Sequence, residues 1–246
     1  MKLSNLLGAT LILLCIVFLG LQSKGLEVEA FGVKAIAMVF LILLYFVKVK
    51  SRSILFALFL LTYGAAEVYN YYTYYDYVED LNTVDPYYLI GNLLFILAYI
   101  FMIAKVLSIM DFSKALVKFP LQILLLFGLG VFVVYMITDI SRDELEAKYL
   151  YITELIYNSV VMFLVCLSLV NYMYNDTKKS MNLLIGSILI VFSEVIQVAY
   201  YYISDYDNTL SVIYSVFLVG AFVFFYLQST IDQEQNSVYA AQEVNA

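Results

Sequence analysis

Two glutamates stand inside long apolar stretches of the sequence, where a charged side chain is costly. Glu67 lies in LTYGAAEVYN and Glu194 lies in IVFSEVIQ. Each is followed three residues later by a side-chain amide, Asn70 or Gln197, which shares its face if the segment is helical. Ionisable groups in hydrocarbon cost about 2.5–3.5 kcal/mol on insertion scales, so they are normally turned toward partners or a cavity. Two carboxyl groups that share a cavity are suited to general acid–base chemistry.

The remaining composition excludes several other chemistries. The chain has no His and no Trp, which removes the usual imidazole base, the usual zinc ligand and any Ser–His or Cys–His nucleophile pair. Cys15 and Cys166 both lie in apolar stretches, which favours buried thiols. We expect no cofactor and no metal. The acidic group that could best bind calcium comprises Asp76, Glu79, Asp80 and Asp85. It lacks the spacing of an EF-hand, which favours solvated acidic turns instead of a calcium site.

The overall composition is that of an integral membrane protein. Of 246 residues, 64% are hydrophobic and 13% are charged, whereas soluble domains carry about a quarter charged residues. The formal net charge of −7 leaves no basic stripe to neutralise phosphates, which argues against nucleic acid as a partner.

We predict an all-α protein with eight transmembrane helices, because about 20 apolar residues cross the hydrocarbon core. The predicted spans are 4–22, 30–48, 53–72, 87–108, 119–138, 150–173, 181–203 and 209–228. Residues 1–230 then form one transmembrane domain, and residues 231–246 form a polar tail that we expect to be disordered. The first span lacks an A-x-A-like cleavage site, so we expect a retained helix instead of a signal peptide.

The distribution of Lys and Arg predicts the orientation in the membrane. The amino terminus and the connections after spans 2, 4 and 6 hold most of them: Lys2, Lys48, Lys50, Arg52, Lys105, Lys114, Lys118, Lys178 and Lys179. The opposite connections hold Lys24, Arg142 and Lys148, with Lys34 just inside span 2. Both termini are therefore predicted to be cytoplasmic.

Spans 3–4 and 7–8 resemble each other and predict an internal repeat. Both pairs begin at the cytoplasmic face, carry a Glu–amide element and turn through an acidic, Tyr-rich connection. An offset of four spans makes the two copies parallel. At 1.5 Å per residue, Glu67 lies roughly 22 Å and Glu194 roughly 20 Å into their spans, so both are expected at one level in the outer half of the bilayer.

Other polar side chains are expected at the same level. Asn92 and Tyr99 approach from span 4, and Glu154 and Asn158, at i and i+4, approach from span 6. These residues predict a polar cavity that opens outward. The structural alternative is that Glu67 and Glu194 are protonated and hydrogen-bond between helices.

These stretches resemble the YhhN-type lysoplasmalogenases, a family of eight-helix membrane proteins. TYGAAEVYN is similar to that family's first S-x-x-G-D-x-x-L-type element, and GSILIVFSEVIQ is similar to its second, G-x-x-x-F-x-x-S-D. IGNLLFILAYIFMI is similar to the family's G-x-x-x-F-x-x-x-H-x-x-Y helix. Both family Asp positions are Glu here, Glu67 and Glu194. The family's His and Tyr positions are Tyr99 and Met102.

The resemblance implies hydrolysis of the vinyl ether of a lysophospholipid to a fatty aldehyde and a glycerophospho-alcohol. One of Glu67 and Glu194 would protonate the vinyl carbon, and the other would stabilise the oxocarbenium-like cation and orient water, as in glycosidases. Asn70 and Gln197 would hold the carboxyl groups or water. The sequence does not assign which Glu is the acid, and it does not predict an oligomeric state.

Two alternative functions stay open at this stage. One is a non-catalytic membrane protein that binds a lipid or another small molecule in the same cavity. The other is a proton-coupled transporter in which Glu67 and Glu194 form a relay. A retinal protein is disfavoured because no Lys lies deep in the seventh span, and an intramembrane Ser–His protease is excluded because the chain has no His.

Overall fold

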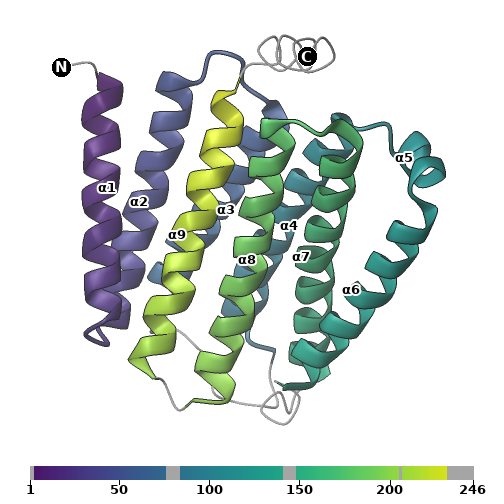
Figure 1. Cartoon of the computed structure of the whole chain (residues 1–246). Helices are drawn as coiled ribbons and strands as arrows, with labels where there is room; N and C mark the ends of the chain where they lie inside the picture. The colour runs from purple at the N-terminus through teal and green to yellow at the C-terminus, as the bar shows by residue number, and fades with distance from the viewer. Residues whose placement is uncertain (1–2, 76–83, 141–147, 205–206, 232–246) are drawn as a thin grey trace.

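The computed structural model describes residues 3–75, 84–140, 148–204 and 207–231, and all regular structure within these ranges is helical (Figure 1). The helices are α1 (Leu3–Gln22), α2 (Glu27–Lys48), α3 (Ile54–Tyr72), α4 (Pro86–Ser108), α5 (Phe112–Lys118), α6 (Pro120–Ile140), α7 (Lys148–Asn175), α8 (Lys178–Tyr202) and α9 (Asn208–Thr230). All except α5 are long and apolar enough to cross a membrane. The eight predicted spans are therefore confirmed. The short α5, in the connection before α6, was not predicted.

Local sequence signals fix where helices begin. Asp85 precedes α4, and its side chain accepts a hydrogen bond from the backbone N–H of Tyr87. Pro86 occupies the first turn, where its missing N–H costs nothing. Thr177 and Ser180 form a capping box at the start of α8. These caps accept hydrogen bonds from backbone N–H groups of the first turn, so they fix where the two helices begin.

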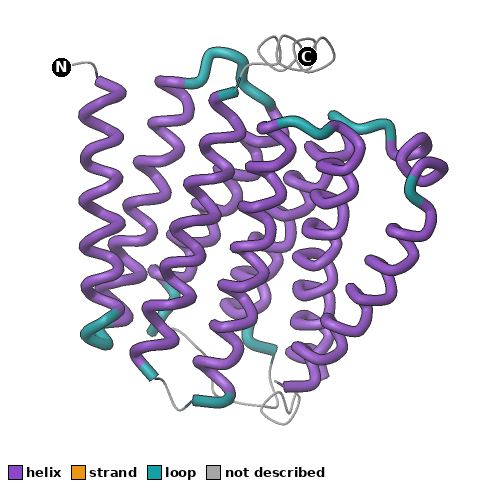
Figure 2. The backbone as a smooth tube through the Cα atoms, viewed as in Figure 1, coloured by secondary structure: helices purple, strands orange, loops and turns teal. Residues whose placement is uncertain are grey.

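The long helices alternate in direction and pack as an up-and-down bundle (Figure 2). Along the chain, α1 packs on α2, α2 on α3, and α3 on α4; α4 then packs on α7, which also contacts α6 and α8. The bundle continues from α8 to α9, and α9 returns to α1. These contacts close a ring of helices, in which the pair α3 and α4 is followed by the pair α7 and α8.

An aromatic cluster centred on Phe59 forms the core of the bundle. The Phe59 ring stacks on Phe222, with ring centroids 5.9 Å apart, and meets Phe225 edge to face at 5.6 Å. Tyr63 and Tyr99 lie against the same ring, with centroids 6.0 and 6.4 Å away. This cluster joins α3, α4 and α9, and its tyrosines lie near Glu67 and Glu194.

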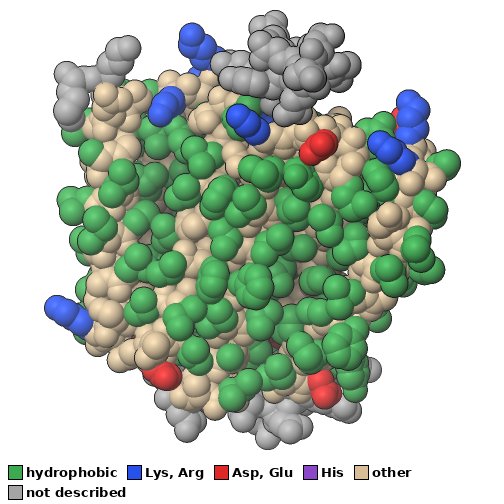
Figure 3. Space-filling model, in the orientation of Figure 1, with side chains coloured by type: hydrophobic (Ala, Val, Ile, Leu, Met, Phe, Trp, Pro, Cys, Tyr) green, Lys and Arg blue, Asp and Glu red, His purple; other side chains and the backbone are tan. Residues whose placement is uncertain are grey.

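The outer surface is that of a membrane-embedded protein. Apolar side chains cover the middle of the molecule, and the charged side chains visible in Figure 3 lie toward its two ends. Helix α6 presents many exposed large apolar side chains: Leu121, Leu124, Leu125, Phe127, Leu129, Val131, Phe132 and Tyr135. The chain is therefore an integral, multi-pass membrane protein.

Because the helices alternate, most described basic residues lie at one end of the bundle. We call it the basic end, defined by Lys48, Lys50, Arg52, Lys114, Lys118 and Lys178. Leu3 and Thr230 lie at this end as well (Figure 1). That this end faces the cytoplasm stays a prediction.

Three other sequence-based predictions stay untested. Sequential packing within the two halves would occur in any up-and-down bundle, so the internal repeat is not established. Residues 232–246 of the predicted tail lie outside the described residues, as do Asp76, Glu79 and Asp80 of the acidic group. The fourth member of that group, Asp85, is buried and serves as the cap of α4.

Candidate functional site

Most of the predicted site residues line one cavity of about 230 Å³ between α3, α4, α7 and α8. We call it the polar cavity. It is lined by Asn70, Tyr88, Asn92, Phe95, Glu154, Tyr157, Asn158, Glu194, Gln197, Val198, Tyr201 and Tyr202. Six of the eight predicted residues are among them, and the two that are not are Glu67 and Tyr99. Two pairs of helices that are distant in sequence, α3–α4 and α7–α8, thus bring two carboxyl groups, four amides and several tyrosines together.

Glu194 is held by two tyrosine hydroxyls. Tyr157 donates to Glu194 Oε1 at 2.7 Å, and Tyr99 donates to the same oxygen at 3.2 Å. Tyr99 therefore touches the site from behind the cavity wall. Among the residues that the structure describes, no hydrogen bond to Oε2 is found, so this is the oxygen that remains for a ligand.

The second carboxyl group of the polar cavity is Glu154. The Tyr88 hydroxyl of α4 donates to Glu154 Oε1 at 2.8 Å, which links α4 to α7. One turn further along α7, Asn158 donates to the Thr138 hydroxyl of α6 at 3.1 Å. No Lys or Arg is found among the described side chains that line the cavity. Its polar groups are therefore carboxyls, amides and hydroxyls.

A glycine allows the amide of Asn70 to reach α4. A Cβ built on Gly91 would lie 2.4 Å from Asn70 Oδ1, which is far too close for a real contact. The absence of a side chain at this position lets α3 and α4 approach each other next to the cavity. Asn92, the next residue, turns its amide nitrogen back to the Tyr88 carbonyl at 3.0 Å.

Glu67 occupies a different environment. Its Oε2 forms a salt bridge of 2.8 Å with Lys34 Nζ of α2, and the residue is only 2% exposed. Lys34 also lies over the ring of Phe31 at 5.0 Å. The Tyr63 hydroxyl lies within electrostatic range of both Glu67 and Glu194. Glu67 does not line the polar cavity, so the two glutamates do not share it.

Two of the three tyrosines that hold the carboxyl groups, Tyr88 and Tyr157, were not predicted from the sequence. Tyr157 is three residues from Glu154 on the same helix face, and Tyr88 is one turn before Asn92. Their spacing was a usable signal, but the abundance of Tyr hid it, since the chain contains 24. The Lys34 partner of Glu67 was also missed, although Lys34 was placed near the outer end of its span.

The site shows no preformed metal centre within the part of the chain that the structure describes. No group of three or more Cys, Asp or Glu side chains there is arranged to hold a metal ion. The carboxyl, amide and phenol groups that line the polar cavity can transfer protons and form hydrogen bonds.

Comparison with known proteins adds no relative. No protein-family model matches the chain, and no curated protein and no solved structure matches it either. The class that the fold and cavity define is an eight-span helical membrane protein with a polar cavity between its helices. The resemblance to YhhN-type lysoplasmalogenases rests on the sequence elements alone.

Proposed function

We propose that the protein is a membrane-embedded hydrolase that cleaves the vinyl ether bond of lysoplasmalogen-type lysophospholipids in the polar cavity. The observation that carries the proposal is the presence of two carboxyl groups, Glu154 and Glu194, in one cavity between the helices. Paired carboxyls perform the related cleavage of glycosidic bonds through an oxocarbenium-like transition state.

In the proposed reaction, Glu194 is the acid. It delivers a proton from Oε2 to the vinyl carbon that is not bonded to oxygen, which leaves a cation shared between the adjacent carbon and the ether oxygen. Glu154 accepts a proton from water as the water adds to that carbon. The resulting hemiacetal collapses to a fatty aldehyde and a glycerophospho-alcohol. Amides such as Asn70 and Gln197 orient the water and the polar part of the lipid.

The depth of the cavity supports a lipid substrate. Glu194 lies 8 residues (202 − 194) before the end of α8, or about 12 Å along the axis. Glu154 lies 6 residues (154 − 148) after the start of α7, or about 9 Å. Both distances match the region just beneath the headgroups, where the first bonds of a lipid chain lie.

This assignment changes the role proposed for Glu67. The sequence pattern suggested Glu67 and Glu194 as the catalytic pair, but Glu67 is paired with Lys34 and does not line the polar cavity. In the proposal, Glu154 takes the second carboxyl role. The Lys34–Glu67 pair holds α2 against α3 behind the site.

The test is release of fatty aldehyde from a lysoplasmalogen by purified protein in detergent. We expect release by the parent, none by Glu194→Gln, and a loss of at least about a hundredfold in Glu154→Gln, since general acid–base groups contribute 10²–10⁴-fold. Glu67→Gln, checked for folding by its melting temperature, is the matched control and should keep activity.

Two outcomes would overturn the proposal. Absence of aldehyde from the folded parent, with lipid bound in the cavity, would identify a binding protein instead. Loss of activity in Glu67→Gln together with full activity in Glu154→Gln would return the catalytic role to the pair suggested by the sequence pattern.

A further inference from the structure

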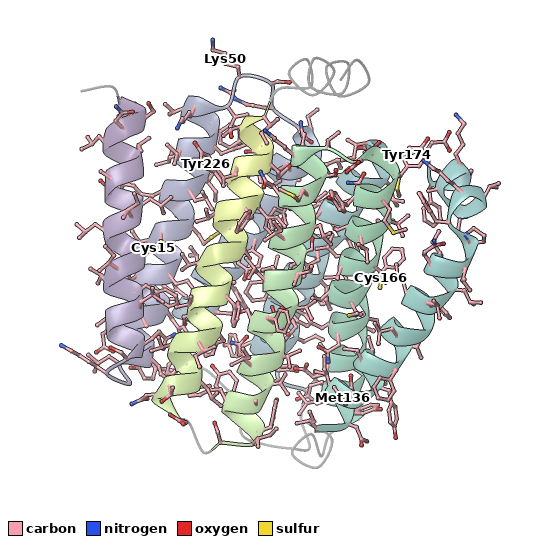
Figure 4. All side chains as sticks on the ribbon, in the orientation of Figure 1. Cys15, Lys50, Met136, Cys166, Tyr174 and Tyr226 are labelled. Atoms are coloured by element: carbon pink, nitrogen blue, oxygen red, sulfur yellow. The ribbon has the colours of Figure 1, made fainter. Side chains whose placement is uncertain are left out.

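A second, chemically different cavity runs along α1, and we call it the apolar crevice. It has a volume of about 300 Å³ and lies between α1, α2 and α9, with α3 at its base. Ser4 and Lys48 line it at the basic end, and Phe18 and Lys34 line it at the other end. Between these ends its walls are almost entirely apolar, with Leu41 as an example. Cys15 and Tyr226, labelled in Figure 4, lie on its α1 and α9 walls.

The dimensions of the crevice fit one hydrocarbon chain. From Ser4 to Phe18 it follows 14 residues (18 − 4) of α1, or about 21 Å. A volume of about 300 Å³ spread over that length gives a mean cross-section of about 14 Å². A channel of this cross-section is about 4 Å across, which matches a single hydrocarbon chain, because carbon atoms make contacts at about 3.5–4.0 Å. A helix of a second copy, about 10–12 Å across, is far too wide.

The crevice is closed at the end away from the basic end. The buried amide of Gln22, at the end of α1, donates to the Tyr214 hydroxyl at 3.1 Å and accepts from Ser211 at 2.7 Å. These bonds fasten α1 to α9 there. The Lys34–Glu67 salt bridge lies at the same end of the crevice. An occupant therefore has its polar part at the basic end.

The basic end of the crevice carries a cation and a hydrogen-bond donor. Lys48 Nζ lies 6.0 Å from the centroid of the Tyr226 ring, and both residues line the crevice. The Tyr226 hydroxyl is buried and makes no hydrogen bond to any residue in the described part of the chain. An ammonium group and a phenol hydroxyl at the mouth of an apolar channel are complementary to a phosphate group attached to a hydrocarbon chain.

We propose that the apolar crevice binds one acyl chain of an anionic phospholipid, whose phosphate lies at Lys48. This lipid is separate from the substrate of the polar cavity, because Tyr63 of the crevice and Phe95 of the polar cavity pack against each other between them, with ring centroids 4.8 Å apart. The proposal does not depend on the proposed hydrolase activity. The bound lipid fills the space between α1 and the rest of the bundle.

The absence of Trp makes the proposal directly testable, because one introduced Trp is the only indole in the protein. Phe222→Trp places the reporter on the inner wall of the crevice, where Phe222 is 7% exposed. Leu125→Trp places the control on the lipid-facing surface of α6, where Leu125 is 64% exposed. Both variants are reconstituted as full chains into vesicles of phosphatidylcholine, with a minor fraction of brominated lipid that quenches indole fluorescence on contact.

We expect brominated phosphatidylglycerol to quench Phe222→Trp at about fivefold lower content than brominated phosphatidylcholine, from the attraction of an anionic lipid to one Lys. Leu125→Trp should respond equally to both lipids. In Phe222→Trp/Lys48→Gln the preference should disappear. If Phe222→Trp fails to fold, Leu11→Trp on the opposite wall, where Leu11 is half-buried, is the second reporter.

Filling the crevice gives an independent control. Gly8 lines the crevice and Gly128 lies on α6, and a Cβ at either position meets nothing within 4 Å. Gly8→Phe should reduce quenching of the Phe222→Trp reporter, whereas Gly128→Phe should not. Absence of quenching by either lipid in Phe222→Trp, or equal quenching by both, would overturn the proposal.

Discussion

One carboxylate oxygen of Glu194 accepts hydrogen bonds from two tyrosine hydroxyls, and the two hydrogen bonds differ in length. The Tyr157 bond is 2.7 Å and the Tyr99 bond is 3.2 Å, so Tyr157 should fix the carboxyl more strongly. We predict that Tyr157→Phe lowers the rate of aldehyde release by about tenfold, the upper range for one hydrogen bond. Tyr99→Phe should lower it less. Equal losses in the two variants, measured as kcat in the same detergent, would contradict this order.

The Lys34–Glu67 salt bridge makes a prediction about stability. The Lys34 side chain is 16% exposed and that of Glu67 is 3% exposed, so removal of Lys34 leaves a buried carboxylate without its cation. We predict that Lys34→Met destabilises the protein by about 3 kcal/mol, the lower range for breaking a buried pair. Lys34→Met/Glu67→Leu should recover most of this loss. Thermal unfolding in detergent measures both, and a double variant less stable than Lys34→Met would refute the prediction.

At the scale of helices, α8 and α9 meet through a glycine. A Cβ on Gly186 would lie 2.6 Å from two ring atoms of Phe225 and 3.2 Å from the backbone oxygen of Ala221. Phe225 is fully buried, so its ring has little room to move. We predict that Gly186→Ala lowers the free energy of unfolding by about 1–3 kcal/mol through overpacking.

Gly128→Ala is the matched control for that substitution. A Cβ on Gly128 meets nothing within 4 Å, so the higher helix propensity of Ala should leave stability unchanged or raise it by up to about 1 kcal/mol. Both variants are compared by thermal unfolding. A Gly186→Ala variant as stable as Gly128→Ala would show that the α8–α9 contact is more adaptable than its geometry suggests.

The helices themselves were predictable from sequence because the length of an apolar stretch is set by the thickness of the bilayer. The observed ends differ from the predicted ones by only a few residues, as for Lys178–Tyr202 against 181–203. The seven-residue α5 was not predictable in this way, since it does not span the bilayer. Its Asp111 cap and its Lys residues indicate a local helix, but they do not form an apolar stretch of the kind that predicts a membrane span.

The candidate site was predicted in part, and the limit was rotation about the helix axes. Depth along a helix follows from residue number. On this basis Asn92, Glu154 and Glu194 were expected at one level, and all three line the polar cavity. The direction in which a side chain points depends on packing between helices, which hydropathy does not determine. Glu67 therefore faces Lys34 of α2, although its depth suggested a place beside Glu194.

At the scale of the whole molecule, the charge distribution predicts the orientation in the membrane. Lys50 lies at the basic end and Lys24 lies in the first connection at the opposite end. In intact cells we expect a membrane-impermeant maleimide to label Lys24→Cys and not Lys50→Cys, with Cys15 and Cys166 replaced by Ala in both. Labelling of Lys50→Cys should require permeabilisation. The reverse pattern would place the polar cavity in the cytoplasmic half of the bilayer.

The bonds of Gln22 to Tyr214 and Ser211 have a consequence for the order of events during synthesis. They join residues 192 and 189 positions apart in the chain. When the first hairpin, α1 and α2, has been inserted into the membrane, α9, which carries Tyr214 and Ser211, has not yet been translated. The amide of Gln22 therefore remains without its partners until the eighth span leaves the ribosome, and a chain truncated before α9 lacks the contact that joins its beginning to its end.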